Sequence, residues 1–245
     1  MEQNTKRVNI LGVTVDSVTM AEAVAQVESY IEEKNAPSLV ATANAEMIMN
    51  AGRDAELMRI LNSAQLVVPD GAGTVWAARH LGYEMKERVA GFDMAQELLK
   101  DAPQKNYRVY FFGSAPGIAE KAKEKAEKLY PGINVVGVHD GYFDAEEEKK
   151  IIADIKEKKP HILFAALGVP KQEKWLFRHK EELGVPVSIG VGGTLDVMAG
   201  AVKRAPLWMQ KAQLEWLFRG LMQPKRAGRL MALPKFVLKV HLSKK

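Results

Sequence analysis

Short, uninterrupted apolar runs alternate with longer segments of helical period along most of this 245-residue chain. The apolar runs predict strands at 8–13, 38–43, 65–69, 108–113, 133–138, 161–167 and 187–192. The intervening segments predict helices near 19–33, 45–61, 72–81, 92–101, 116–130, 145–158 and 171–183. Because the strands are apolar throughout rather than alternating, both faces of their sheet must be covered. The sequence therefore predicts an α/β fold, with a Rossmann-like parallel sheet flanked by helices.

The pattern changes near residue 200, after "VGGTLDVMAG" (191–200). Beyond it we expect no strand, only short helices divided by Pro224 and Pro234, because proline starts a helix well and continues one badly. From Lys203 onward, 11 Lys and Arg stand against one acid, Glu215, whereas the first 202 residues carry 24 basic and 29 acidic residues. We therefore predict an α/β catalytic domain over 1–200 and a helical basic appendage over 201–245 whose partner is anionic.

Composition and missing motifs indicate the cellular compartment of the protein and exclude several kinds of catalytic chemistry. The chain has no cysteine, its first residues lack the apolar core of a signal peptide, and no run approaches the roughly 20 apolar residues that cross a bilayer. A cytoplasmic protein is the expectation. The five histidines lack metal-ligand spacing, and G-x-S-x-G, Walker A, G-x-G-x-x-G and D-x-D patterns are missing, so we expect neither a metal nor a cofactor.

Polar groups or glycine turns follow nearly every predicted strand. In an open parallel sheet, ligands bind beyond the carboxyl ends of the strands. The side chains concerned are Thr42, Asn44 and Glu46, then Asp70, the turn "GSAPG" (113–117), the trio Lys171, Gln172 and Glu173, and finally Gly193, Thr194 and Asp196. Their concentration predicts a site along this edge.

Each of these features also has an ordinary structural interpretation. Asp70 precedes two small residues and suits a turn or a helix N-cap. "GSAPG" permits a phosphate at a helix N-terminus, but a tight strand–helix turn needs the same residues. Lys171 to Glu173 suit a solvated first helical turn, and Thr42 suits a strand.

Six motifs in order resemble the WecG/TagA/CpsF glycosyltransferase family. They are "ATANAEMI" (41–48), "VVPDGAGTVWAARHLG" (67–82), "ERVAGFD" (87–93), "HDGYF" (139–143), "ALGVPKQEKW" (166–175) and "GVGGTLDVMAG" (190–200). The tail segment "EWLFRGLMQPKRAGRLMALPKF" (215–236) is similar to the TagA branch. That resemblance implies transfer of N-acetylmannosamine (ManNAc) from UDP-ManNAc to undecaprenyl-diphosphate-GlcNAc, which forms the ManNAc-β-1,4-GlcNAc linkage unit of wall teichoic acid.

The resemblance also implies residue roles. Asp70 corresponds to the general base, and Thr42 and Gln172 to polar residues that line the same pocket. The expected donor-binding residues are Asn44, Arg88, Gly113, Gly193 and Asp196. The tail arginines Arg219, Arg226 and Arg229 correspond to groups that meet the diphosphate of the acceptor.

Chemistry is consistent with these roles. An inverting transfer needs one carboxylate to take the proton of the attacking hydroxyl. Without a metal it also needs cations where the leaving diphosphate develops charge, and "KERVAGFD" (86–93) and the tail contain them. A retaining hydrolase would instead need a second carboxylate, for which Glu173 is the candidate.

The tail interleaves aromatic and aliphatic side chains with Lys and Arg, a composition typical of segments that lie in a lipid headgroup layer. We therefore expect a protein peripheral to the inner face of the cytoplasmic membrane. An alternative is a helical pair packed on the body or forming a homo-oligomer interface, because apolar stripes on helices are more often buried.

Other functions stay open at this point. One keeps the fold but uses another UDP-sugar, such as the uronic acid of ManNAc, with Lys171 as the extra cation. Another is a nucleotide-binding module whose tail binds nucleic acid, although the tryptophans and long aliphatics favour lipid and we expect no nucleic acid partner. A nicotinamide dehydrogenase is weakened by the missing G-x-G-x-x-G motif.

Overall fold

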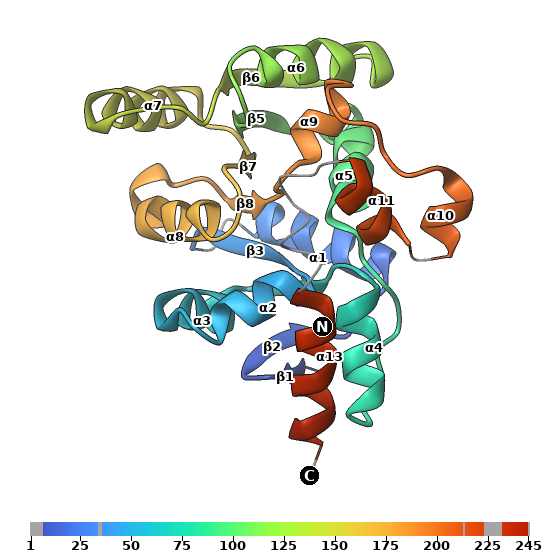
Figure 1. Ribbon diagram of the computed structural model, residues 1–245. Helices are drawn as coiled ribbons and strands as arrows, with labels where there is room; N and C mark the ends of the chain where they lie inside the picture. The colour runs from blue at the N-terminus through green and yellow to red at the C-terminus, as the bar shows by residue number, and fades with distance from the viewer. Residues whose placement is uncertain (1–6, 34–35, 213, 223–231, 245) are drawn as a thin grey trace.

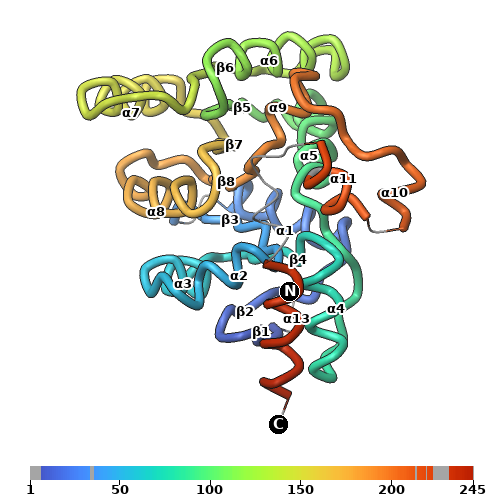
Figure 2. The backbone as a smooth tube through the Cα atoms, in the orientation of Figure 1, coloured from blue at the N-terminus to red at the C-terminus, as the bar shows by residue number. Residues whose placement is uncertain are grey.

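Six parallel strands form the central sheet, as the uninterrupted apolar runs predict. The computed structural model describes residues 7–33, 36–212, 214–222 and 232–244. The strands are β3 (Ser38–Ala43), β4 (Leu66–Pro69), β5 (Arg108–Gly113), β6 (Asn134–His139), β7 (Ile162–Ala166) and β8 (Val187–Gly190). They lie in the order β4-β3-β8-β7-β5-β6 (Figure 1, with β4 labelled in Figure 2). The predicted α/β class is confirmed, and each of these strands ends within two residues of its predicted bounds.

Helices cover both faces of the sheet (Figure 2). On one face lie α2 (Ala45–Ala51), α3 (Ala55–Ser63), α4 (Ala72–His80), α7 (Ala145–Lys158) and α8 (Lys171–Leu183). On the other lie α1 (Met20–Glu32), α5 (Gly91–Lys105), α6 (Ile118–Leu129) and α9 (Thr194–Met198). Successive strand residues point to opposite faces, so Tyr110 and Phe112 join the first core whereas Val109 and Phe111 join the second. Both cores are apolar, which explains why the strands do not alternate.

Two sequence predictions were wrong in detail. Residues 8–13 do not form one strand: β1 (Arg7–Ile10) and β2 (Val13–Asp16) pair as an antiparallel hairpin outside the main sheet. Both residues of its turn, Leu11 and Gly12, have positive φ, as a tight hairpin turn of this hand requires. Leucine rarely takes that conformation, so the apolar run hides the turn.

The helix predicted over 45–61 is two helices, α2 and α3. Gly52 closes the first, and the Asp54 side chain accepts a hydrogen bond from the backbone N–H of Leu57 (3.1 Å) to begin the second. The continuous apolar periodicity of this segment conceals the break.

The strand order creates a crevice at the carboxyl ends of β3 and β8. These two strands are neighbours, yet the helix that follows β3 (α2) packs on one face of the sheet and the helix that follows β8 (α9) packs on the other. Diverging connections of this kind mark the usual ligand site of an open α/β sheet.

The described part of the C-terminal segment contains helices, as expected, and the last of them belongs to the core. The prediction that Pro234 divides two helices was wrong: Pro234 is the third residue of the last helix, where the backbone N–H groups have no partner within the helix in any case. Pro224 lies outside the described residues. After α10 (Leu207–Lys211) and α11 (Glu215–Met222) comes α13 (Ala232–Ser243), which lies beside α2 and α4 (Figure 1). Its Phe236 and Val240 are fully buried. Within the described ranges, no helix is long and apolar enough to cross a membrane.

We predict that α13 contributes substantially to folding stability. Replacing Phe236 with alanine should lower the free energy of unfolding by about 3–5 kcal/mol, because the ring leaves a cavity between α13 and the body. Urea denaturation measures this, with Val237→Ala as the control, since Val237 on the same helix is 40% exposed. Equal small losses in both variants would show that α13 does not belong to the core.

Candidate active site

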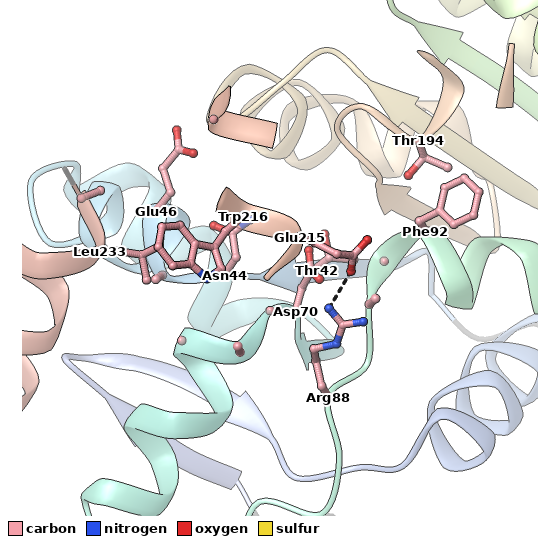
Figure 3. A pocket seen from close by; sticks show the side chains of 18 of the residues that line it. Thr42, Asn44, Glu46, Asp70, Arg88, Phe92, Thr194, Glu215, Trp216 and Leu233 are labelled. Atoms are coloured by element: carbon pink, nitrogen blue, oxygen red, sulfur yellow. Dashed lines mark hydrogen bonds and ion pairs between the residues drawn. The ribbon is translucent and has the colours of Figure 1, made fainter. Parts of the chain in front are cut away.

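A cavity of about 210 Å³ opens at the carboxyl ends of β3, β4 and β8, where the switch in strand order lies (Figure 3). Its walls come from the ends of these strands, the first turns of α2, α4 and α5, and the C-terminal segment. The lining residues that carry side chains of chemical interest are Thr42, Asn44, Glu46, Asp70, Arg88, Phe92, Thr194, Arg204, Glu215 and Trp216. The predicted edge of the sheet therefore does carry a site-shaped cavity.

Asp70 directly follows the C-terminal end of β4 and precedes α4. Its backbone N–H donates to the carbonyls of Ala43 and Val68 (both 3.0 Å), which anchors the residue to β3 and β4. The N-cap of α4 is Gly71, with φ +87° and no side-chain capping bond, so Asp70 is not the cap that its position in the sequence suggested. Its carboxylate lines the cavity instead (Figure 3).

Two further predicted residues reach the same cavity from β3 and its connection to α2. The hydroxyl of Thr42 donates to the carbonyl of Gly190 (3.1 Å), which ties β3 to β8 at the cavity floor. Asn44 caps α2 by accepting from the backbone N–H of Met47 (3.0 Å). The N-terminus of α5 lies against Thr42, because a Cβ at Gly91 would come within 2.8 Å of the Thr42 methyl group.

Arg88 meets a carboxylate from the C-terminal segment. Its Nη1 donates to Oε2 of Glu215 (2.7 Å), and Nε of Arg204 donates to Oε1 of the same carboxylate (3.1 Å). Arg204 in turn makes a two-pronged bond to Asp93 (2.6 and 2.8 Å) and lies over the ring of Phe92. Partial burial favours the neutral acid, but the bond from Arg88 and the charge of Arg204 outweigh it and lower the pKa of Glu215.

Gln172 does not line the cavity, contrary to the expected pocket wall. It is buried, its Oε1 accepts from the backbone N–H groups of Gly168 and Gly192 (both 3.1 Å), and its Nε2 donates to Oε1 of Glu173 (2.7 Å). It thus ties together the turns that follow β7 and β8. A role in catalysis for Gln172 stays a prediction.

Glu173 is equally buried and lies outside the cavity, so the second carboxylate of a retaining hydrolase is not where that alternative needs it. In the part of the chain that the structure describes, its Oε2 has no hydrogen-bond partner. Burial raises the pKa of Glu173 to about 7, because the bond from Gln172 compensates only part of the lost hydration.

A second cavity lies beyond β5, β6 and β7 and takes in the remaining predicted side chains. It is lined by Ser114, Ala115, Gly141, Tyr142, Phe143, Ala166, Leu167, Lys171 and Asp196. Asp196 accepts from the hydroxyl of Ser114 (3.2 Å), and Lys171 lies over the ring of Phe143. Lys171 is therefore in a different cavity from Asp70.

Of the two predicted glycines, Gly113 has a structural reason for its identity, whereas a Cβ at Gly193 would meet nothing closer than 3.8 Å. Gly113 has φ +123°, and a Cβ there would come within 2.5 Å of the backbone of Ala166. Gly193 precedes α9, between the lining residues Val191 and Thr194. Neither glycine lines a cavity, and donor contact by their backbones stays a prediction.

The tail arginines are the part of the predicted site on which the structure says least. Arg219 belongs to α11, but its side chain lies outside the description, as do Arg226 and Arg229 entirely. Their acceptor role stays a prediction.

Sequence reasoning did not predict that Arg204, Glu215 and Trp216 line this cavity. The signal for Glu215 was present, because it is the single acid among the tail's basic residues. Its partners could not be found from sequence, since Arg88 is 127 residues away along the chain.

Comparison with known proteins gives the class of enzyme to which this chain belongs. A parallel α/β sheet with a carboxylate and arginines at its carboxyl edge suits a transferase that uses an anionic, activated donor. Residues 8–245 match the glycosyl transferase WecG/TagA/CpsF family, and the chain belongs to that family. It is therefore a glycosyltransferase.

Named relatives come from Staphylococcus aureus strains MW2, NCTC 8325 / PS 47 and MRSA252. Each is an N-acetylglucosaminyldiphosphoundecaprenol N-acetyl-beta-D-mannosaminyltransferase. Each is 35% identical to this chain over 243 residues, which cover 99% of this chain and 95% of the relative.

We predict that the contribution of the buried Glu173 to the free energy of unfolding falls as the pH rises. The folded protein holds this proton up to about pH 7, whereas the unfolded chain releases it near pH 4.5. The contribution of Glu173 to stability is therefore full below pH 4.5 and is lost as the pH rises to about 7, by about 3 kcal/mol at most. Replacing Glu173 with glutamine should remove this loss, so the variant gains stability relative to wild type between pH 5 and pH 8.

Denaturant unfolding at both pH values measures the difference. Glu181→Gln on the same helix is the control, since the side chain of Glu181 is 74% exposed. A constant difference between Glu173→Gln and wild type at the two pH values would contradict the prediction.

Proposed function

We propose that this enzyme transfers N-acetylmannosamine from UDP-ManNAc to undecaprenyl-diphosphate-GlcNAc, with inversion and without a metal. The observation that carries the proposal is the placement of Asp70 and Arg88 in one cavity at the switch in strand order. The names of the S. aureus relatives support the acceptor and the transferred sugar. By the resemblance of the tail to the TagA branch, the product would serve as the linkage unit of wall teichoic acid.

The proposed chemistry is one displacement. A hydroxyl oxygen of the acceptor GlcNAc attacks the anomeric carbon of ManNAc, the bond from that carbon to the UDP oxygen breaks, and UDP leaves from the opposite face. Asp70 takes the hydroxyl proton, a contribution typically worth 10²–10⁴ in rate. The guanidinium group of Arg88 lies in the same cavity and neutralises charge on the leaving diphosphate.

The donor is proposed to span both cavities. The segment after β8 contributes to each of them, since Thr194 lines the first cavity and Asp196 the second. Asp196 and Ser114 offer polar groups, and Tyr142 an aromatic face, to the nucleoside. The sugar and diphosphate then extend toward Asp70 and Arg88.

A carboxylated donor sugar is a weaker alternative on this geometry. It would favour an extra cation beside the reacting sugar, and Lys171, the candidate for that role, lies in the second cavity. UDP-ManNAc needs no such cation.

The lipid acceptor requires the enzyme to work at a membrane surface, and the C-terminal segment is the proposed contact. Its exposed large apolar side chains are Leu207, Trp208, Trp216, Leu221, Met222, Val237, Leu238 and Leu242. Among basic residues, such a surface suits the headgroup layer of the inner leaflet, where each basic residue adds about 1 kcal/mol near anionic lipid.

The reaction is tested by UDP release from UDP-ManNAc with a short-chain lipid-diphosphate-GlcNAc acceptor, in the presence of EDTA. We predict turnover by the wild-type enzyme and a loss of about 10²–10⁴ in kcat for Asp70→Asn, which keeps the shape of the side chain but removes the base. Glu46→Gln, another acid of the same cavity, is the control and should lose far less. Turnover that needs a metal, or that is indifferent to Asp70, would refute the proposed mechanism.

Membrane binding is tested by flotation with vesicles that contain phosphatidylglycerol. We predict that Trp208→Glu lowers the bound fraction about tenfold, because the variant loses an apolar anchor and adds a negative charge. Leu129→Glu is matched in charge and exposure but lies on α6, outside the C-terminal segment, and should bind as wild type does. Equal binding by both variants, or preferential binding of duplex DNA by wild type, would reject this surface.

A further inference from the structure

The carboxylate of Glu215 lies where two arginines of the cavity converge. Arg88 donates to one of its oxygens (2.7 Å) and Arg204 to the other (3.1 Å), and Figure 3 shows the first of these bonds inside the cavity. Two guanidinium groups around a two-oxygen anion form the arrangement by which proteins bind phosphate. Glu215 thus fills an anion position with a group from the chain itself.

Arg204 is held in this position independently of Glu215. Its Nη1 and Nη2 both bond to Asp93 on α5, and its guanidinium lies 4.6 Å from the centre of the Phe92 ring. These contacts leave Nε for the shared anion. Arg88 of the α/β body and Arg204, which Asp93 and Phe92 of the body hold in place, therefore form the anion position, and Glu215 is its occupant.

The charge balance indicates that this occupant must leave when substrate binds. Among the described lining side chains, the three carboxylates (Glu46, Asp70 and Glu215) outnumber the two guanidinium groups (Arg88 and Arg204), which gives a net charge of −1. A cavity of that sign disfavours an anionic diphosphate. Removing Glu215 brings the balance to zero and frees Nη1 of Arg88.

We propose that Arg88 and Arg204 form one diphosphate-binding site and that Glu215 is an internal anion that fills it until substrate arrives. The inference rests on the proposed function for the identity of the substrate. When a diphosphate displaces Glu215, α11 loses its ionic tie to the body, so binding and movement of the C-terminal segment are coupled. The diphosphate belongs either to the nucleotide donor or to the lipid acceptor, and both offer the same chemistry.

The first test is titration of the full-length protein with UDP and with geranyl diphosphate, which lacks a nucleoside. Glu215→Gln should bind at least one of them about tenfold more tightly than wild type, because the competing charge is gone while the site remains. Tighter binding of UDP by this variant assigns the site to the donor. Tighter binding of geranyl diphosphate alone assigns it to the acceptor. Unchanged or weaker binding of both ligands would overturn the proposal.

Two matched variants make this test specific. Glu46→Gln removes the same charge from the same cavity, so equal tightening in both variants would reduce the effect to net charge and refute an occupied site. Adding Arg204→Lys to Glu215→Gln should abolish the gain, since lysine cannot keep the two-pronged bond to Asp93 and also reach the anion. If the double variant still binds diphosphate more tightly than wild type, Arg204 is not part of the proposed site.

Hydrogen–deuterium exchange of residues 215–222 tests whether the ion pair of Glu215 holds α11 to the body, and this test does not depend on the reaction. Glu215→Gln should raise exchange in this segment without ligand, and the bound diphosphate should raise it in wild type. If UDP fails to bind at all, the proposed donor is wrong. The exchange rate of the unliganded variant still shows whether Glu215 holds α11 to the body. Unchanged exchange in Glu215→Gln would show that Glu215 does not hold α11, and would overturn the coupling.

Discussion

Burial of both sheet faces is the constraint on which the rest of this structure depends. Helices cover the alternate side chains of the six parallel strands, so the sheet itself presents little chemistry to solvent. Functional groups must then come from the strand ends, and parallel pairing brings all six carboxyl ends to one edge. The neighbours β3 and β8 send their helices to opposite faces, and the cavity lies in the crevice between them.

Ion pairs connect the C-terminal segment to the residues around this cavity. The basic appendage is tied to the body around the cavity by two ion pairs: its single acid, Glu215, pairs with Arg88, and its Arg204 pairs with Asp93. The segment proposed to meet the membrane is thereby tied to the arginine proposed to meet the donor. The carboxylate of Glu215 separates the charges of Arg88 and Arg204, which would otherwise repel each other.

Most of the fold could be predicted from sequence, because hydrophobic periodicity follows directly from burial. The errors arose where local signals were weak. Leu11 conceals a hairpin turn inside an apolar run, and apolar periodicity continues across the break at Gly52. Polar residues after each strand predicted the edge at which the cavity opens, yet Gln172 faces inward to bond Gly168, Gly192 and Glu173. The first turn of a helix does not reveal which of its side chains points into a cavity.

The sequence by itself determined the fold class, the family and the edge of the sheet at which the cavity opens. These follow from short-range patterns and ordered motifs, which need no knowledge of distant contacts. Only the tertiary structure decided which polar residues share a cavity: it separated Asp70 and Arg88 from Lys171 and Asp196, and it paired Arg88 with Glu215. The physical reason is that ion pairs and cavities join residues over a hundred positions apart, and such contacts exist only after the strands are placed in order.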